Sequence, residues 1–328
     1  MRYKCCRYLH NGLSFQLNEI RPCNNVNYGV ILYDTKSDGT NIDIEKVFKR
    51  REFYIEKCKK GEYFEPCVNC SCFVEDDWDD NININYLCLF HWLHCNCDCV
   101  YCFQEDERKK LIGGFTDKIE KSQYYDVYPI LKYLSDNNKF INDKLHVEFG
   151  GGEPTILKEL PDIISLITEN GYNSAIIMSS GILYSDAIEK FLQHEKSFLS
   201  VTIAAGSREI YKKIKRRDKF EQVKENIARY IKSSKYPENI MVRYLIYEGI
   251  NDTEKDIKDW LEMCEEIGVK KLEITFEFCK SLGEKAGKPY SKHLDGLIDF
   301  YNKYTQEKGI FDASIDYVTK EIIKKGHY

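Results

Sequence analysis

The chain has 328 residues, 43% of them hydrophobic and 31% charged, which is typical of a globular protein with room for one domain of roughly 200 residues and a smaller one. A formal net charge of −5 points to neither nucleic acid nor membrane, and no apolar run approaches the ~20 residues of a membrane span. The first residues lack the apolar core of an export signal, so we expect a cytoplasmic protein with no nucleic-acid or membrane partner. Fourteen cysteines, in a compartment that keeps thiols reduced, favour metal or iron–sulfur ligation.

Residues 1–80 contain seven of these cysteines and are predicted to form a small module. Partial alternation over Leu13–Cys23 predicts a hairpin that turns at Asn18-Glu19, and helical spacing follows over Ile44–Lys60. This order of elements can gather four thiolates around one centre. The candidate ligands are Cys6, Cys23, Cys67 and Cys70, with Cys5 or Cys72 as substitutes. The spacing leaves an iron–sulfur cluster, a structural zinc ion and a set of buried thiols all open.

An acidic run from Glu75 to Asp80 is predicted to be a solvated linker, and residues 84–328 then alternate strand-like and helical patterns. The predicted strands are Tyr86–Leu93, Leu145–Phe149, Ser174–Met178, Leu199–Ala204, Met241–Ile246 and Leu272–Phe276. The predicted helices are Tyr124–Leu134, Leu160–Glu169, Ser185–His194, Phe220–Ile231 and Thr253–Ile267, with caps at Ser185 and at Asp252 or Thr253. Such alternation predicts an α/β fold with a parallel sheet, and periodicity does not distinguish an open sheet from a barrel.

Cys95, Cys99 and Cys102 follow the first of these strands at the spacing C-x3-C-x2-C. Three thiolates so close together can hold three irons of a four-iron cluster and leave the fourth iron to a non-protein ligand. A structural zinc site would need four ligands, commonly as two C-x2-C pairs, and only Cys99 and Cys102 make such a pair here. We therefore predict an iron–sulfur cluster with an open iron at this loop.

A glycine-rich turn, Gly150-Gly151-Gly152-Glu153-Pro154, ends the second predicted strand. Adjacent glycines let a backbone run tight against a ligand and adopt angles that are closed to other residues. They also leave backbone carbonyls free to accept hydrogen bonds from an ammonium group. A turn of this kind is a weak signal alone, and its place one βα unit after the cysteine loop strengthens it.

The C-x3-C-x2-C spacing, with Tyr101 before the last cysteine and the Gly-Gly-Glu turn that follows, resembles the radical S-adenosylmethionine (SAM) superfamily. The resemblance implies a partial (β/α)6 barrel of the TIM type, with its site at the C-terminal ends of the strands and a C-terminal helical extension. It implies that the open iron takes the amino and carboxylate groups of SAM. It further assigns Gly151, Gly152 and Glu153 to the SAM amino group, and the Tyr101 backbone to the adenine.

Other cofactor contacts are predicted at the ends of later strands. Ser180 lies in a short polar turn after the third strand, and Thr202 ends the fourth, where many relatives carry Ser-x-Asp and this chain has no carboxylate. Arg243, in the apolar fifth strand, would be costly to bury without a counter-charge and suits a carboxylate, so it is a candidate for the SAM carboxylate. Lys215–Arg217 are predicted to be a solvated helix end, with contact between one of them and the ligand as the alternative. Asn251 is predicted to cap a helix, with a contact to SAM as the alternative.

The N-terminal cysteines resemble the SPASM/twitch auxiliary-cluster modules of radical SAM enzymes, which more often follow the barrel than precede it. This resemblance implies a second 4Fe-4S cluster on Cys6, Cys23, Cys67 and Cys70.

The superfamily resemblance implies an enzyme that reductively cleaves SAM to methionine and a 5′-deoxyadenosyl radical, which abstracts a substrate hydrogen. It also implies an electron donor of the flavodoxin or ferredoxin type. Our first hypothesis for the reaction is oxidation or cross-linking of a peptide. The alternative is oxidation or epimerisation of a sugar or another small metabolite. A non-catalytic iron–sulfur electron carrier is a hypothesis of another class, and it would need neither the glycine turn nor six βα units.

Overall fold

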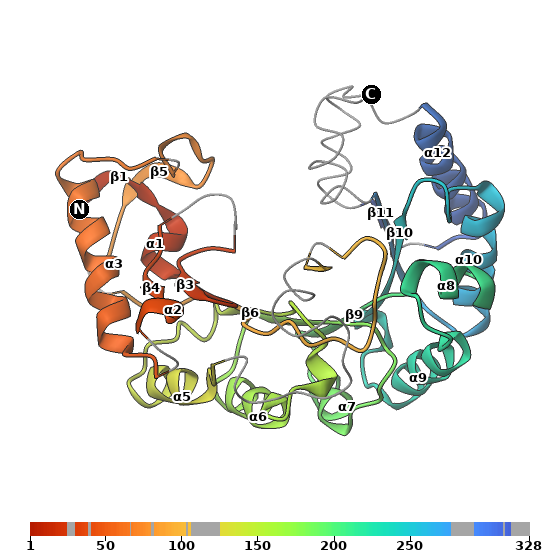
Figure 1. Ribbon diagram of the computed structural model, residues 1–328, viewed down its shortest axis with the longest axis horizontal. Coiled ribbons are helices and arrows are strands. Elements are labelled where there is room, and N and C mark those ends of the chain that lie inside the picture. The colour runs from red at the N-terminus through yellow and green to blue at the C-terminus, as the bar shows by residue number, and fades with distance from the viewer. Residues whose placement is uncertain are drawn as a thin grey trace. The chain divides into compact units, whose positions relative to one another are not determined.

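The computed structural model describes residues 1–24, 30–38, 41–65, 67–79, 82–102, 104–105, 125–276, 292–310 and 312–315 (Figure 1). The chain divides into two compact units. Unit 1 comprises Met1–Leu93 and Ile119–Ile176, and unit 2 comprises His94–Lys118 and Ile177–Tyr328. In the described part of the chain, no helix is both long and apolar enough to cross a bilayer.

The sheet of unit 1 is built around β6 (Tyr86–Phe90), which pairs in parallel with β7 (His146–Phe149) on one side and with β2 (Gly12–Gln16) on the other. Strand β2 forms the predicted hairpin with β3 (Glu19–Arg21), and β3 pairs antiparallel with β4 (Tyr33–Asp34). The N-terminal hairpin therefore extends the same sheet that carries β6 and β7.

The helices of unit 1 begin and end where the sequence supplies caps. α3 (Ile44–Lys59) begins at Asp43, whose carboxylate accepts hydrogen bonds from the backbone N–H groups of Glu45 and Lys46. α3 ends at Lys60 and Gly61, and Gly61 adopts a φ of +75°. The unit also contains the short helices α1 (Arg7–Asn11) and α2 (Thr35–Asp38) and the 3-10 turns η1 (Cys67–Asn69) and η3 (Pro154–Ile156).

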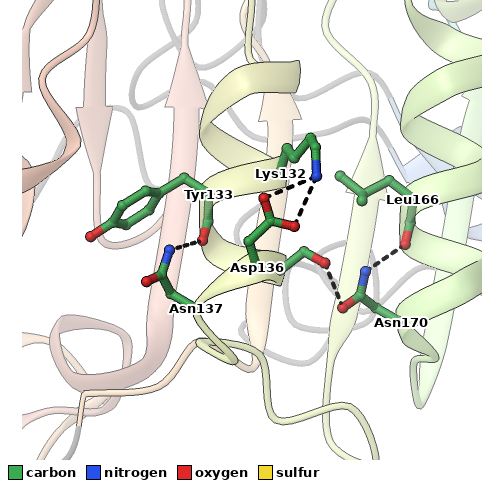
Figure 2. Close-up of polar contacts among 7 residues, drawn as sticks. Lys132, Tyr133, Asp136, Asn137, Leu166 and Asn170 are labelled. Carbon is green, nitrogen blue, oxygen red and sulfur yellow. Dashed lines mark hydrogen bonds and ion pairs between the residues drawn. The ribbon is translucent and has the colours of Figure 1, made fainter.

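α5 (Tyr128–Asp136) and α6 (Leu160–Asn170) bury apolar faces and lie along one face of this sheet (Figure 1). Their C-terminal ends are joined, because Ser135 Oγ donates to Asn170 Oδ1 at 2.9 Å (Figure 2). The Asn170 and Asn137 amides each donate, at 2.8 Å, to a backbone carbonyl four residues earlier. An ion pair of 2.8 Å between Lys132 and Asp136 adds an i,i+4 contact on the exposed side of α5.

A two-stranded ribbon joins β1 (Arg2–Cys6) antiparallel to β5 (Phe73–Asp77). The prediction of a solvated linker is wrong for Glu75–Asp77, because these residues pair with the N-terminal strand. Their side chains are exposed, which explains their polar composition, while Trp78 is buried and its Nε1 donates to the Tyr3 carbonyl at 2.8 Å. Backbone pairing thus overrides the low strand propensity of the acidic residues.

In unit 2, β10 (Ile240–Ile246) pairs in parallel with β9 (Ser197–Thr202) and β11 (Lys271–Phe276), and β11 pairs in parallel with β12 (Asp312–Ile315). Strand β8 (Ser174–Ser179) begins in unit 1 and ends in unit 2. The described helices of the unit are α7 (Asp186–Phe191), α8 (Arg208–Lys215), α9 (Phe220–Ser233), α10 (Glu254–Glu266) and α12 (Lys292–Glu307), with the 3-10 turn η4 (Pro237–Asn239). The predicted caps are confirmed at Ser185 and Thr253, whose hydroxyls accept from the backbone N–H groups three residues on.

The predicted fold class is confirmed: this is an α/β fold with a mostly parallel sheet, as expected of a partial (β/α) barrel. All six predicted strands are present within a few residues. The largest difference is at β6, which ends at Phe90 because His91–Leu93 leave the strand as a buried loop. Strand β12 and the pairing of β2 with β6 were not predicted.

Candidate functional site

The three cysteines of the C-x3-C-x2-C motif lie on one loop of unit 2 and are half-buried. The Cys102 N–H donates to the Cys99 carbonyl at 3.1 Å, so the last two cysteines belong to one tight turn. The Cys97 N–H donates to Cys95 Sγ at 3.4 Å. A backbone N–H directed at a thiolate is the contact that sulfur ligands of iron accept in proteins.

This loop is held against the C-terminal end of α8. The N–H groups of Val100 and Asp98 donate to the carbonyls of Ile214 and Lys215, at 2.9 and 3.3 Å. Arg216, in the left-handed conformation with a φ of +51°, pairs with Glu105 at 3.1 Å and Asp98 at 3.4 Å. Backbone and side chains together therefore fix the cysteine loop to this helix end.

Lys215 is the buried residue of this helix end, with 2% of its surface exposed, so the prediction of a solvated position is wrong for it. Its ammonium donates to the Tyr101 hydroxyl and lies 5.0 Å from the centroid of that ring. Burial lowers the pKa of Lys215, but electrostatic interactions, chiefly with Cys99 and Cys97, outweigh burial and raise the pKa above its ordinary value. Cys95 also acts electrostatically on Lys215, and Cys102 acts on Tyr101, so each of the three motif cysteines influences one member of this ammonium–phenol pair.

Two more buried donors lie in the same place. Asn96 is 3% exposed, and its Oδ1 accepts from Ser180 Oγ at 2.9 Å, while its Nδ2 has no hydrogen-bond partner among the described residues. The hydroxyl of the fully buried Tyr211 also has no hydrogen-bond partner in the described part of the chain. Tyr211 interacts electrostatically with Cys97 and Cys99. Buried polar groups are normally satisfied, so these donors, with Lys215, fit an anionic group held by the cysteines.

The glycine-rich turn lies in unit 1 and packs against the end of β6. Gly151 has a φ of +90°, and a Cβ there would lie 3.1 Å from both Phe90 Cα and the Trp92 carbonyl oxygen. The Gly152 N–H donates to that same carbonyl at 3.0 Å. Glu153 is buried and accepts from the backbone N–H and hydroxyl of Thr155, at 3.1 and 2.7 Å. The expected need for glycine is confirmed at Gly151, where conformation and space both exclude a side chain.

Thr202 and Arg243 are paired residues on β9 and β10, and Arg243 is paired in turn with Glu273 on β11. Arg243 Nε donates to Glu273 Oε1. Glu273 therefore supplies the counter-charge that Arg243 needs in this strand. The predicted contacts of Thr202 and Arg243 with SAM remain predictions.

Asn251 does not cap α10, because Thr253 does. Its fully buried amide instead bonds three backbone groups from two segments. Oδ1 accepts from the Tyr247 N–H at 2.6 Å, and Nδ2 donates to the carbonyls of Ala204 at 2.9 Å and Leu245 at 2.8 Å. Ala204, just beyond β9, has a φ of +55°. Asn251 thus positions the turn that follows Thr202.

The sequence profile of the radical SAM superfamily matches residues 89–264, which is more than half of the chain and includes the cysteine loop and the glycine-rich turn. The chain belongs to the radical SAM superfamily. Membership implies SAM and a four-iron cluster as cofactors, and the three cysteines with their buried donors fit such a cluster.

Relatives with curated names are distant. A probable GTP 3′,8-cyclase of Saccharolobus islandicus (strain Y.N.15.51 / Yellowstone #2) is 24% identical over 216 residues, which cover 66% of this radical SAM chain and 64% of the relative. The chain thus spans slightly less than two thirds of that protein. The structure of Streptococcus suis SuiB, solved bound to precursor peptide SuiA, matches this one with a TM-score of 0.53 at 11% sequence identity. The match covers 82% of this chain and 62% of the SuiB chain. SuiB solved bound to S-adenosylmethionine matches with a TM-score of 0.52 at 11% sequence identity, and the match covers 84% of this chain and 57% of the SuiB chain. At these identities the likeness to SuiB shows the fold alone.

The four N-terminal candidate cysteines all lie in unit 1, and they act on one another electrostatically. Burial raises the pKa of Cys6 to about 12, with Cys23 and Cys67 adding to the effect. Burial raises the pKa of Cys67 to about 11, with Cys23 and Cys70 adding to it. Cys72 lies near Cys70 and Cys23, whereas Cys5 forms a hydrogen bond with Cys58.

Neighbouring residues of a strand point to opposite sides, which explains why Cys5 and Cys6 of β1 have different partners. Within the described ranges, no group of three or more His, Cys, Asp or Glu side chains stands ready as a site for a metal ion.

Sequence reasoning missed Asn96, Tyr211, Glu273 and the burial of Lys215. A signal existed for the last of these, because Lys215 follows Tyr211 and Ile214 at the i+4 and i+1 positions of a short helix, next to its apolar stripe. No local pattern marks Glu273, since its partner lies on another strand.

Proposed function

We propose that this chain is a radical SAM enzyme whose SAM-binding four-iron cluster is held by Cys95, Cys99 and Cys102. The observation that carries the proposal is that the loop of these three cysteines is fixed by backbone hydrogen bonds to the end of α8, where the buried Lys215 donates to Tyr101 of the loop, in a chain that belongs to the superfamily. When bound, the cluster and SAM supply reductive cleavage to methionine and a 5′-deoxyadenosyl radical, which abstracts a hydrogen atom from the substrate.

Residues of this chain bind and orient SAM in the proposal. The Gly151-Gly152 backbone, free of side chains, receives the SAM amino group, and Glu153 is held for the same contact by its bonds to Thr155. The Tyr101 backbone contacts the adenine. Ser180, Thr202 and Arg243 are assigned to the remaining polar groups of SAM, with Ser180 oriented by Asn96 and Arg243 by Glu273.

The N-terminal cysteines are proposed to hold a second 4Fe-4S cluster of the SPASM/twitch kind, in a module formed by residues 1–80. The electrostatic interactions of Cys6 with Cys23 and Cys67, and of Cys67 with Cys23 and Cys70, support this ligand set. Thiolate ligands also suit zinc, so the alternative occupant of the same four cysteines is a structural zinc ion.

The proposed substrate is a peptide, which is oxidised or cross-linked. The likeness to SuiB, solved with a precursor peptide, supports this choice, and the auxiliary cluster would accept the electron that the oxidation releases. A small metabolite is the alternative, supported by relatives named for the cyclisation of GTP. The electron donor is proposed to be a flavodoxin or ferredoxin.

The test is anaerobic purification, followed by iron and sulfide analysis and by incubation with SAM and dithionite. We expect about eight irons per chain if both clusters are present, about four if the N-terminal site holds zinc, and formation of 5′-deoxyadenosine in both cases. Replacing Cys95, Cys99 and Cys102 together by alanine should remove about four irons and abolish 5′-deoxyadenosine.

Cys97→Ala is the matched control, because Cys97 lies in the same loop outside the motif, and it should retain both properties. An alanine triple variant that still cleaves SAM would refute the proposal. Clusters without SAM cleavage in the wild type would instead indicate an electron carrier.

A further inference from the structure

Around the cysteine loop, the described part of the chain buries a positive charge without an ion-pair partner and hydrogen-bond donors without acceptors. Lys215 is 2% exposed, Tyr211 is fully buried and Asn96 is 3% exposed. Among the described residues the Tyr211 hydroxyl and Asn96 Nδ2 have no hydrogen-bond partner. Lys215 donates to a phenol, and no carboxylate in the described part of the chain forms an ion pair with it.

A buried ammonium is costly unless an anion compensates its charge. The groups whose charges act on Lys215 are Cys99, Cys97, Tyr211 and Cys95. The carboxylates of the same loop and of the residues after it, Asp98 and Glu105, pair with Arg216 instead. The compensating anion is therefore supplied by the motif cysteines Cys95 and Cys99, and a four-iron cluster on three thiolates gains one further negative charge when it is reduced.

We propose that Lys215, together with Tyr211 and Asn96, raises the reduction potential of the cluster held by Cys95, Cys99 and Cys102, and so makes it reducible by a protein electron donor. The inference rests on the proposed function. Lys215 acts by charge at short range in a poorly solvated site, where screening is weak. Tyr211 and Asn96 act as donors to cluster or cysteine sulfur, and hydrogen bonds to sulfur are a known determinant of cluster potential.

The experiment is a redox titration of the anaerobically reconstituted full chain, followed by the electron paramagnetic resonance signal of the reduced cluster. Lys215→Met keeps the length and apolar stem of the side chain and removes the charge. We expect its ratio of reduced to oxidised cluster to fall at least tenfold at the wild-type midpoint, a shift of ~59 mV to lower potential for one electron. Lys215→Arg should stay within threefold of wild type, and Tyr211→Phe should move the ratio about threefold in the same direction as Lys215→Met.

Lys213→Met is the matched control. Lys213 lies on the same helix and carries the same charge, but it is exposed and pairs with Glu209 at 2.7 Å. Its loss should leave the midpoint unchanged, because solvent screens it. A purely structural role for Lys215 predicts unchanged midpoints in every variant that still binds iron.

Iron is counted before each titration, which separates the two proposals. A wild-type chain without a cluster refutes the proposed function itself. A Lys215→Met chain with full iron content and an unchanged midpoint overturns this inference and leaves the function intact. If Lys215→Met does not retain iron, Tyr211→Phe decides, since it removes only a hydroxyl group, and an unchanged midpoint there overturns the inference.

Discussion

Replacing Gly151 by alanine tests the glycine-rich turn on physical grounds that do not depend on any cofactor. The residue has a φ of +90°, and the added Cβ would lie 3.1 Å from Phe90 Cα and from the Trp92 carbonyl oxygen. The backbone conformation costs an alanine about 1–2 kcal/mol. Pressing a methyl group against backbone atoms that cannot rotate away adds about 1–3 kcal/mol. We therefore expect Gly151→Ala to lower the free energy of unfolding by ~2–5 kcal/mol.

Gly61→Ala isolates the two contributions. Gly61 ends α3 with a φ of +75°, and no atom lies within 4 Å of where its Cβ would be. This variant should therefore lose only the conformational part, about 1–2 kcal/mol. The assay is urea denaturation followed by circular dichroism, with SAM binding measured alongside. Equal losses in the two variants would show that the contact with β6 is not tight and would refute the reasoning.

Three further predictions concern polar groups that are buried or partly buried. Asn251→Ala should lower the free energy of unfolding by about 3 kcal/mol or more, measured by urea denaturation, because it leaves three backbone groups without their hydrogen-bond partner. A loss below about 1 kcal/mol would contradict this expectation. Asn251→Asp should also be destabilised, since a carboxylate cannot donate to two carbonyls. Arg51→Met should cost about 2–4 kcal/mol in the same assay, because the buried guanidinium satisfies three carbonyls at the end of α1, and Arg51→Lys should recover only part of the loss. Burial raises the pKa of Glu148, but hydrogen bonds, chiefly from His146, outweigh burial and hold the pKa below its ordinary value. The ionised carboxylate therefore stabilises the fold above about pH 4.3, and this contribution is lost as the pH falls through the lower folded-state pKa. Urea midpoints of cluster-free protein should accordingly fall more steeply between pH 6 and pH 3 in the wild type than in Glu148→Gln, and parallel profiles would argue against it.

The parts of the fold that sequence alone predicted are those fixed by local pattern. Ser185 and Thr253 cap helices because a hydroxyl before an apolar-periodic run satisfies backbone N–H groups wherever the helix lies. The alternation of strands and helices predicts a parallel sheet for the same reason. Gly151 was identified because only glycine combines a positive φ with close backbone approach.

The parts that sequence did not predict depend on contacts between distant segments. Glu75–Asp77 look like a linker until β1 pairs with them, and Arg243 looks uncompensated until Glu273 lies beside it on the next strand. Lys215 looks solvated because basic residues at a helix end usually are, whereas in the folded chain it is buried and donates to Tyr101 of the cysteine loop. Hydrophobic periodicity contains no information on these pairings, so they require coordinates.

The parallel pairing of β2 with β6 also determines how the chain responds to truncation at its N-terminus. Deleting its first 80 residues would strip β6 of a neighbour and leave a row of bare N–H and C=O groups along a hydrophobic strand. Such an edge invites pairing with other chains and aggregation. The N-terminal region therefore covers the edge of β6. If a protein shortened in this way is insoluble, the exposed strand edge explains the insolubility, and the loss of the N-terminal cysteines is not needed to explain it.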